Sequence, residues 1–468
     1  MVTQNDMNKK IQIPEELKYR SIKNLVFMFR PGFGNHVLND SGAQIWNWIK
    51  TSSYSIRDMI GFLTTGLPSQ ATEEINRREN GVLDFINRLH SLGLIAFEGD
   101  SNRDFNDFSP ASEKRPADAE SDDATDGMDD IFKRGYEQNI PIIVDLNITD
   151  ECNLRCLHCY APLNDPASAP KPAATCRKPF NLEEYKELLR QLANMGTFYL
   201  TLTGGEIFTH PHFLDIYKYA FDHHFAIRLV SNGTLLKPEI ADELQKMKPR
   251  MINISLHGAR PETHDEVTAV KGSFNRTVNA LKMLKERDLN VSIIHVVTKL
   301  DIAEAKAVDQ LANTLGIPRS TTPLICPTAE GELKPLKLRI SDADMRQLMR
   351  DGLYRPQRDV CTAAKRCTIS SYGDVSPCLF LQNVIVGNLR ENSFEEIWHS
   401  ENMRRTRESA DYLPPAECVA CESFQYCPRC PALAFAEDGD YRKPSTEACR
   451  ISAIYKSTLK EKGVPNHE

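Results

Sequence analysis

Short apolar runs alternate with longer segments of helical periodicity between residues 141 and 327. The first run, PIIVDLNIT at 141–149, has the length and composition of a buried strand. Segments such as NLEEYKELLRQLANM, in which apolar residues recur at helical spacing, separate the runs. The other five runs are TFYLTLTGG, AIRLVSNG, MINISLHG, VSIIHVVTK and STTPLICP. Six β-α alternations predict an α/β fold with a parallel sheet covered by helices.

Unusual turns follow the first four of these runs. A loop with three cysteines follows the first, and TGGE, SNGT and SLHG follow the second, third and fourth. In parallel sheets, functional residues gather beyond the carboxyl ends of the strands. We therefore expect the four turns to converge on one rim of the sheet.

Residues 1–100 predict a separate α+β unit. NLVFMFRPG is typical of a strand, and NHVLNDSGAQIWNWI leads from a strand into a helix. GVLDFINRLHSLGLIAFEG indicates a helix, a stop at Gly93 and a closing strand. Residues 101–135 are acidic and poor in large apolar side chains, so we expect a disordered linker there.

The composition is that of a soluble, cytoplasmic protein. The 468 residues predict two to four domains, and a content of 41% hydrophobic and 26% charged residues is ordinary. The net charge of -7 argues against nucleic acid as a partner. We expect no membrane partner, because no apolar run is long enough to span a bilayer, and no secretory signal is visible.

Thirteen cysteines are strongly clustered, which in a reducing compartment suggests metal binding. Three lie at 152–159 and eight at 361–449, while Cys176 and Cys326 stand apart.

The first cluster has too few thiols for a closed site. A four-iron cluster has four corners, and Cys152, Cys156 and Cys159 would leave one iron without a protein ligand. An open iron suits a cluster that binds a substrate. Structural zinc completed by His158 is the alternative.

The sequence CNLRCLHCY, with an aromatic residue after the last cysteine, resembles the CxxxCxxC motif of the radical S-adenosylmethionine (SAM) superfamily. The order of the later turns resembles that superfamily too. The resemblance implies a partial (β/α)6 barrel over residues 136–330, and a [4Fe-4S] cluster on the three cysteines whose open iron chelates S-adenosylmethionine. It further implies that this cofactor contacts Tyr160, Gly204, Gly205, Glu206, Ser231, Asn232 and Ser255.

Two positions depart from the family's pattern. Ile207 stands where many relatives have proline, and Thr268 stands where relatives often have arginine. If that arginine binds the cofactor's carboxylate, Lys271 or Arg228 is the candidate substitute. The sequence identifies no catalytic base.

The C-terminal cysteines resemble the SPASM domain, a twin-cluster extension of radical SAM proteins. We assign residues 331–358 to a bridging segment, 359–455 to this domain and 456–468 to a tail. The resemblance implies two auxiliary [4Fe-4S] clusters that transfer electrons. It gives the first Cys361, Cys367, Cys378 and Cys430, and the second Cys418, Cys421, Cys427 and Cys449. Two zinc ribbons are the alternative, and Cys326 is interpreted as a buried, small apolar residue.

The N-terminal unit resembles the winged-helix-like recognition element of peptide-modifying enzymes, whose type example is the small chaperone of pyrroloquinoline quinone biosynthesis. The pattern LN-x-SGA-x-IW carries most of the likeness. In that family a leader peptide adds a strand to an exposed sheet edge. A generic winged-helix fold is the alternative.

Together these resemblances imply a radical SAM maturase of ribosomally synthesised precursor peptides, with an electron donor such as flavodoxin or ferredoxin. A thioether crosslink is the first choice, followed by a carbon–carbon or carbon–oxygen bond. One alternative is a sulfatase-activating oxidase, which the leucine at Leu379 weakens because that group commonly has an aspartate there. The other is a non-catalytic peptide-binding or electron-transfer scaffold.

Overall fold

The computed structural model describes residues 6–22, 25–30, 34–38, 40–51, 54–65, 68, 71–98, 133, 135–161, 178–328, 331–358, 361, 363–409 and 413–461. Residues 101–132 of the expected linker, and Cys176, lie outside these ranges. The chain forms two compact units, Met1–Ile140 with His224–Ala226, and Pro141–His223 with Ile227–Glu468. Within the described part of the chain, no helix is long and apolar enough to cross a membrane.

Within its described residues up to 98, the N-terminal unit contains a three-stranded antiparallel sheet of order β2-β3-β4, a small β1-β5 pair and three helices. The strands are β1 (Ile11–Gln12), β2 (Lys18–Ile22), β3 (Leu25–Arg30), β4 (Gly34–Leu38) and β5 (Ala96–Phe97). The helices are α1 (Asp40–Ile49), α2 (Ile56–Thr64) and α3 (Thr72–Ser91), preceded by η1 (Asp6–Asn8). The predicted order of strand, helix and closing strand is therefore confirmed.

The unit has its own core, built around Trp46 of α1, whose side chain is fully buried. Every residue of the central strand β3 is buried, as expected for a strand covered by helices. A reciprocal capping box between Ser55 and Asp58 starts α2. Gly93 has the positive φ of 63° that lets the chain turn from α3 into β5.

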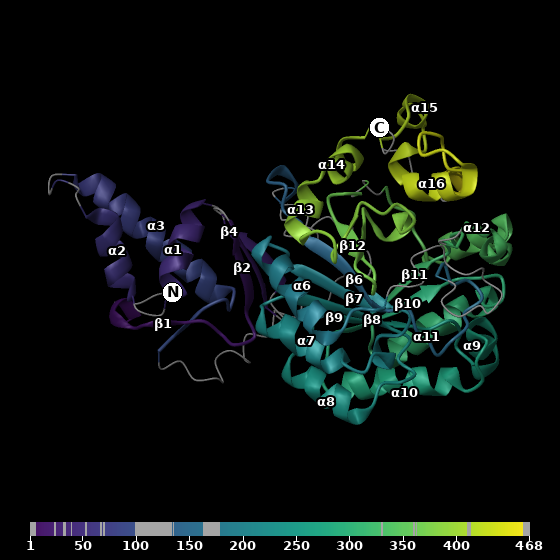
Figure 1. Cartoon of the computed structure of the whole chain (residues 1–468), viewed down its shortest axis with the longest axis horizontal. Coiled ribbons are helices and arrows are strands. Elements are labelled where there is room, and N and C mark those ends of the chain that lie inside the picture. The colour runs from purple at the N-terminus through teal and green to yellow at the C-terminus, as the bar shows by residue number, and fades with distance from the viewer. Residues whose placement is uncertain are drawn as a thin grey trace. The chain divides into compact units, whose positions relative to one another are not determined.

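The second unit is built on one nine-stranded sheet of order β11-β10-β9-β8-β7-β6-β12-β13-β14 (Figure 1). The six strands from β11 to β6 in this order are the strands predicted for the barrel, so that prediction is confirmed. They are β6 (Ile143–Thr149), β7 (Tyr199–Gly204), β8 (Ala226–Ser231), β9 (Met251–Ser255), β10 (Val291–Val296) and β11 (Arg319–Thr322). The last strand is shorter than its apolar run, because Pro323 cannot donate a hydrogen bond to a neighbouring strand.

Helices connect these strands and pack along them (Figure 1). They are α6 (Leu182–Asn194), α7 (Phe213–Asp222), α8 (Pro238–Lys246), α9 (Pro261–Thr268), α10 (Ser273–Glu286) and α11 (Ala305–Leu315), with short η3 (Ile207–Thr209) and η4 (Ile302–Glu304). In α6, apolar side chains at helical spacing face the sheet: Tyr185, Leu188, Leu189 and Leu192. A capping box between Asn181 and Glu184 fixes where that helix begins.

The C-terminal region extends the barrel sheet, which the sequence did not predict. The strand β12 (Cys367–Ile369) pairs in parallel with β6, and β13 (Asp374–Ser376) and β14 (Gly387–Asn388) follow in antiparallel order. The remaining elements are α13 (Phe394–His399), α14 (Glu401–Glu408), α15 (Ala416–Val419), α16 (Pro431–Asp438) and α17 (Thr446–Glu461), with η6 (Leu379–Leu381) and η8 (Phe424–Tyr426).

The bridging segment and the end of the chain pack together. The segment contains η5 (Lys334–Leu338) and α12 (Asp342–Arg350), and α12 shares an apolar core with α17. The helix α17 runs through residue 455, where the boundary between domain and tail was expected. Residues up to Glu461 therefore belong to the packed structure.

This core gives a first prediction. Ile451 of α17 is fully buried against α12, so Ile451→Ala should lower the free energy of unfolding by about 2–4 kcal/mol. Val419→Ala is the control, because Val419 is 58% exposed and the change should stay within about 0.5 kcal/mol. Chemical denaturation followed by circular dichroism measures both, and equal midpoints for the two variants would contradict the packing.

Candidate functional site

The three cysteines of the first cluster lie in the loop that follows β6, and all three are partly buried. Burial raises the pKa of the Cys156 thiol above its usual range, and the charges of Cys159 and Cys152 raise it further. The backbone N–H of Leu154 donates to Cys152 Sγ at 3.4 Å. Three neighbouring thiols fit a cluster with one open iron.

Backbone hydrogen bonds attach this loop to the end of α9. The N–H groups of Arg155 and Leu157 donate to the carbonyls of Thr268 and Val267, each at 3.0 Å. The Thr268 side chain is fully buried and bonds to Ser273 Oγ at 2.7 Å. Position 268 therefore supports the cysteine loop, and a long arginine side chain would not fit there without rearrangement.

The two proposed substitutes for that arginine lie in different surroundings. The Arg228 guanidinium donates to the Asn253 side chain, and burial lowers its pKa. Lys271 is exposed, two residues before the start of α10. The surroundings of neither residue identify it as the ligand of the cofactor's carboxylate.

The glycines after β7 make room for the cysteine loop itself. A Cβ on Gly204 would lie 2.2 Å from the Thr149 carbonyl oxygen, and one on Gly205 would lie 2.1 Å from the Glu151 carbonyl oxygen. The N–H of Gly205 donates to Thr149 O and that of Glu206 to Glu151 O, both at 2.8 Å. The first and second turns are thus joined backbone to backbone.

Glu206 joins the second turn to the third. Its side chain is fully buried and accepts hydrogen bonds from Ser231 Oγ (2.7 Å), Asn232 N (2.7 Å) and Phe208 N (3.1 Å). Burial raises the pKa of this carboxyl. Ser231 Oγ also accepts the N–H of Gly233 at 2.8 Å. The side chains of Glu206 and Ser231 therefore form hydrogen bonds within the protein, whereas the family resemblance implied only contacts with the cofactor.

Asn232 joins the third turn to the cysteine loop. Its Nδ2 donates to Asn153 Oδ1 at 3.0 Å and lies 3.9 Å from Cys152 Sγ. Asn153 Nδ2 donates in turn to Thr234 Oγ1 at 2.7 Å. Ser255 is partly buried at the end of the neighbouring strand β9. The predicted convergence of the first three turns on one rim is confirmed by these contacts.

Tyr160, after the third cysteine, faces the C-terminal region. Its ring lies 6.4 Å from that of Phe380 between centroids. Burial and the nearby charges of Cys159, Asp145 and Cys326 raise the pKa of the phenol, and a hydrogen bond with Gln382 opposes this. Tyr160 therefore stands between the cysteine loop and the segment that follows Cys378.

The C-terminal thiols form two groups. The charges of Cys361 and Cys430 act on Cys378, and these three pack around Leu381 and Ala432. The second group has four members whose charges act on one another: Cys418, Cys421, Cys427 and Cys449. These groupings match seven of the eight thiols that the resemblance assigned to auxiliary clusters.

Backbone N–H groups point at several of these sulfurs, as iron-bound thiolates require. The N–H groups of Phe380 and Leu381 lower the pKa of Cys378, although burial raises it overall to about 12. Those of Ala432 and Leu433 act in the same way on Cys430. The donor set therefore fits an iron–sulfur cluster.

Cys367 differs from the other seven. It is fully buried on β12, opposite Val144 of β6. Burial raises the pKa of its thiol, and the neighbouring charges that modify it are those of Asp145, Arg366 and Arg407. Cys367 therefore lies in the strand that joins the C-terminal region to the barrel sheet.

Three buried histidines and the partly buried His158 lie together beside the cysteine loop. The rings of His158 and His257 are 4.6 Å apart between centroids, and those of His257 and His264 are 5.9 Å apart. His295 Nε2 lies 3.0 Å from Asp301 Oδ2. One ring nitrogen of each histidine has no hydrogen-bond partner among the described residues. Burial lowers the pKa of His158 and of His264 to about 4, so both rings are neutral near pH 7.

Sequence reasoning considered only His158, as a fourth zinc ligand. In the described part of the chain, no three His, Cys, Asp or Glu side chains are placed to hold a single metal ion. A signal for the group was present, because His257 belongs to the SLHG turn and His264 follows it closely along the chain. The backbone N–H of His257 donates to His264 Nδ1 at 3.0 Å, so this pair shapes the fourth turn.

The close approach at Gly205 gives a second prediction. In Gly205→Ala the Cβ would overlap the Glu151 carbonyl, so the joined turns must separate and the thermal midpoint should fall by several degrees. Gly61→Ala is the matched control, because nothing lies within 4 Å of a Cβ there and alanine is favoured in a helix. Differential scanning calorimetry measures both, and an unchanged midpoint in Gly205→Ala would rule out the backbone contact.

The histidine group gives a third prediction. Because the pKa of His264 is about 4 in the folded chain and about 6.5 when unfolded, the unfolded chain binds more protons between these values. The free energy of unfolding should therefore fall as pH decreases from about 6.5 to 4, by up to about 3 kcal/mol.

His264→Asn keeps an acceptor for the His257 N–H but cannot be protonated, so its stability should depend less on pH. His212→Asn, at a half-exposed position, is the control. Urea titrations at several pH values measure these slopes, and identical slopes in His264→Asn and the unsubstituted chain would contradict the assignment.

Two family models match the chain. Residues 146–312 match the radical SAM superfamily, and residues 361–431 match the SPASM iron–sulfur cluster-binding domain. Each match contains one of the two cysteine clusters.

The chain is also similar in sequence to curated proteins. An AdoMet-dependent heme synthase of Methanosarcina barkeri is 29% identical over 65% of this chain and 95% of its own length. The mycofactocin maturase MftC of Mycolicibacterium smegmatis is 29% identical over 63% of this chain and 79% of its own. The subtilosin biosynthesis protein AlbA of Bacillus subtilis is 26% identical over 62% and 67%.

Solved structures share the fold. Streptococcus suis SuiB bound to its precursor peptide SuiA covers 94% of this chain and 99% of its own, with a TM-score of 0.61 and 15% identity. The structure of anSMEcpe with bound AdoMet covers 69% of this chain and 98% of its own, with a TM-score of 0.56 and 15% identity. The chain is thus a radical SAM enzyme that carries a C-terminal SPASM domain.

Proposed function

We propose that this enzyme matures a ribosomally synthesised peptide by forming an oxidative crosslink, with a thioether as the first choice and a carbon–carbon or carbon–oxygen bond next. The observation that carries the proposal is the extent of the structural likeness. SuiB, solved with its precursor peptide, matches 94% of this chain, whereas the match to anSMEcpe covers 69% of it. MftC and AlbA, which also act in peptide maturation or bacteriocin biosynthesis, are sequence relatives.

Cys152, Cys156 and Cys159 would hold the SAM-binding cluster, and their donor chemistry fits three of its four corners. When bound, this cluster and S-adenosylmethionine supply a 5′-deoxyadenosyl radical that abstracts hydrogen from carbon. The protein's own contribution is to place the cofactor and to exclude water from the reacting atoms.

The residues of the joined turns would bind the cofactor chiefly through their backbone. The side chains of Glu206 and Ser231 are already bonded to each other, so the available groups are main-chain atoms around Gly204 and Gly205. Asn232 would hold the third turn against Cys152. Tyr160, in the loop after β6, and Ser255, at the end of β9, would complete the site.

The C-terminal thiols would hold two auxiliary clusters that accept the second electron of the oxidation. One would use Cys418, Cys421, Cys427 and Cys449, and the other Cys361, Cys367, Cys378 and Cys430. Flavodoxin or ferredoxin would supply the reducing electron.

The leader of the peptide would bind the N-terminal sheet as an added strand. The strand β4 stands at an edge of this sheet, and its central side chains are partly buried. Pairing along such an edge supplies affinity through the backbone, while side-chain pockets supply selectivity.

A heme-synthase-like reaction on a porphyrin is the second candidate, because the Methanosarcina barkeri relative is matched over nearly its whole length. That match covers 65% of this chain, whereas the likeness to SuiB covers 94%. A peptide substrate accounts for the additional N-terminal unit, which a porphyrin does not require.

The fourth prediction tests the proposal by mass spectrometry of the peptide. Protein whose clusters have been reconstituted in the absence of oxygen is mixed with S-adenosylmethionine, dithionite and the short peptide encoded beside the gene. The peptide should lose two hydrogens per modified site, and 5′-deoxyadenosine should form. The same peptide without its leader should react far more slowly, because it lacks the added strand.

The control is the triple variant Cys152→Ala, Cys156→Ala, Cys159→Ala, which should form no 5′-deoxyadenosine. Thiol labelling of the product separates a thioether from a carbon–carbon bond. An unchanged peptide together with turnover of a porphyrin would favour the second candidate.

A further inference from the structure

Arg429 lies between a thiol of one auxiliary group and a thiol of the other. Cys430, which follows it directly, belongs to the first group, with Cys378, and Cys427, two residues earlier, belongs to the second group, with Cys449. Neighbouring Cα atoms are about 3.8 Å apart, so the backbone of Arg429 is within about 8 Å of both cysteines. The chain itself therefore keeps this arginine close to one thiol of each group.

The Arg429 side chain is buried against the loop that joins α16 to α17. The residue is only 7% exposed. Its Nε donates to the carbonyl of Lys443 at 3.3 Å, and its Nη2 donates to the same carbonyl at 3.2 Å and to the carbonyl of Tyr441. The guanidinium is thus held in a defined place by neutral backbone oxygens.

This loop runs from one group of thiols to the other. Tyr441 belongs to the same apolar patch as three thiols of the first group. Further along the loop, the carbonyl of Ser445 accepts the backbone N–H of Cys449, a thiol of the second group, at 2.9 Å. The oxygens that bind the Arg429 guanidinium therefore lie between the two groups.

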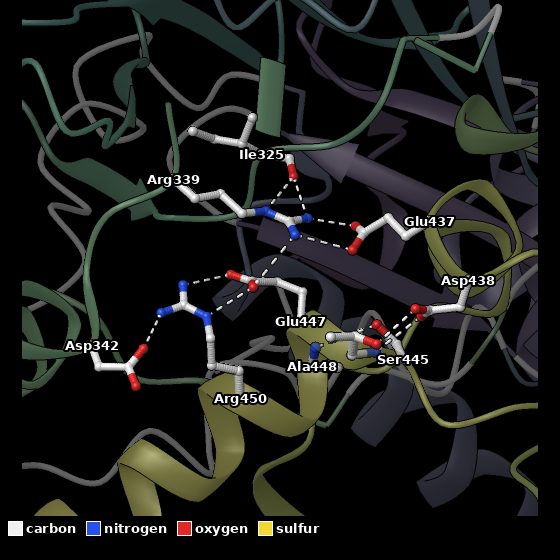
Figure 2. A network of polar contacts seen from close by, with 10 residues as sticks. Ile325, Arg339, Asp342, Glu437, Asp438, Ser445, Glu447, Ala448 and Arg450 are labelled. Carbon is white, nitrogen blue, oxygen red and sulfur yellow. Dashed lines mark hydrogen bonds and ion pairs between the residues drawn. The ribbon is translucent and has the colours of Figure 1, made fainter. Parts of the chain in front are cut away.

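The carboxylates around the loop are bound to other groups. Arg339 Nη1 lies 3.1 Å from an oxygen of Glu437 at α16 and 3.5 Å from an oxygen of Glu447 at α17 (Figure 2). Two further carboxylates have their own partners: Asp438 binds Thr446, and Asp440 binds Arg442. Among the described residues, Arg429 forms no ion pair with a carboxylate, and its hydrogen bonds go to backbone carbonyls.

A buried positive charge of this kind requires a neighbouring anion, because burying an unpaired charge is costly. A four-iron cluster held by four thiolates is an anion, and it becomes more negative when it accepts an electron. A fixed positive charge beside it therefore favours the reduced form and raises the reduction potential. Arginine suits this part, because its guanidinium stays protonated throughout the working pH range.

We propose that Arg429 is the shared counter-charge of the two auxiliary clusters and raises the reduction potential of both. This inference rests on the proposed function. In that reaction the peptide first loses one hydrogen atom, and then releases one electron to an oxidised auxiliary cluster and one proton to solvent as the crosslink forms. Arg429 makes the transfer of that electron more favourable.

The fifth prediction compares reduction potentials in the triple variant Cys152→Ala, Cys156→Ala, Cys159→Ala, in which only auxiliary clusters contribute iron. Adding Arg429→Gln keeps an N–H donor for the carbonyls but removes the charge, so both midpoint potentials should fall. At a fixed potential the ratio of reduced to oxidised cluster should decrease about tenfold, which is about 59 mV for a one-electron couple. Redox titration followed by electron paramagnetic resonance measures the potentials, and iron analysis shows whether both clusters are retained.

Arg429→Lys is the rescue variant, because lysine keeps the charge but lacks the fork that binds two carbonyls. It should restore most of the lost potential, and also the iron if Arg429→Gln binds less of it. Arg442→Gln is the matched control, because that arginine lies on the same loop with its side chain 70% exposed. Solvent screens its charge, so the potentials should not change.

Unchanged potentials in Arg429→Gln would overturn the inference. An equal loss of potential or of iron in Arg429→Gln and Arg429→Lys would overturn it too, because the loss would then come from the shape of the side chain and not from its charge. Neither result would contradict the proposed function. A triple variant that binds no iron at all would instead reject the auxiliary clusters, and with them both the inference and the proposed function.

Discussion

The catalytic end of the barrel depends on an extremely close contact between two stretches of backbone. The carbonyl oxygens of Thr149 and Glu151 occupy the places where side chains at positions 204 and 205 would begin. Only glycine permits this, and Gly204 also has the positive φ of 137° that other residues rarely adopt. Through Glu206 the contact extends to the third turn, so three loops behave as one body.

In this arrangement, polar residues at the rim also hold the turns together by hydrogen bonds. A buried carboxylate with three donors is satisfied and resists exchange with solvent. A site assembled in this way keeps its shape before any cofactor arrives, which lowers the cost of binding. Nearby, burial lowers the pKa of His158 and of His264, so both rings are neutral near pH 7.

The barrel could be predicted from sequence because its strands are apolar runs with clear ends, and its helices have strong periodicity and capping boxes. The C-terminal strands could not, since β12 and β13 have three residues each, too short for any period. The cysteine positions were visible, but nothing in them indicated that the strand beginning at Cys367 pairs with β6. Likewise, spacing alone did not show that Glu206 would bind Ser231, 25 residues later.

The pairing of β12 with β6 has a consequence for how the protein is made. The strand that leads into the radical cysteine loop is flanked by β7 on one side and by β12 on the other. The side-chain contact between Asp145 and Arg366 spans 221 positions of the chain. Such distant pairing forms late, because closing a long loop costs entropy before it gains contacts. During synthesis, one edge of β6 therefore has no partner strand until the ribosome has released residues 367–369. Iron delivered before that point would reach a cysteine loop whose supporting sheet is still incomplete.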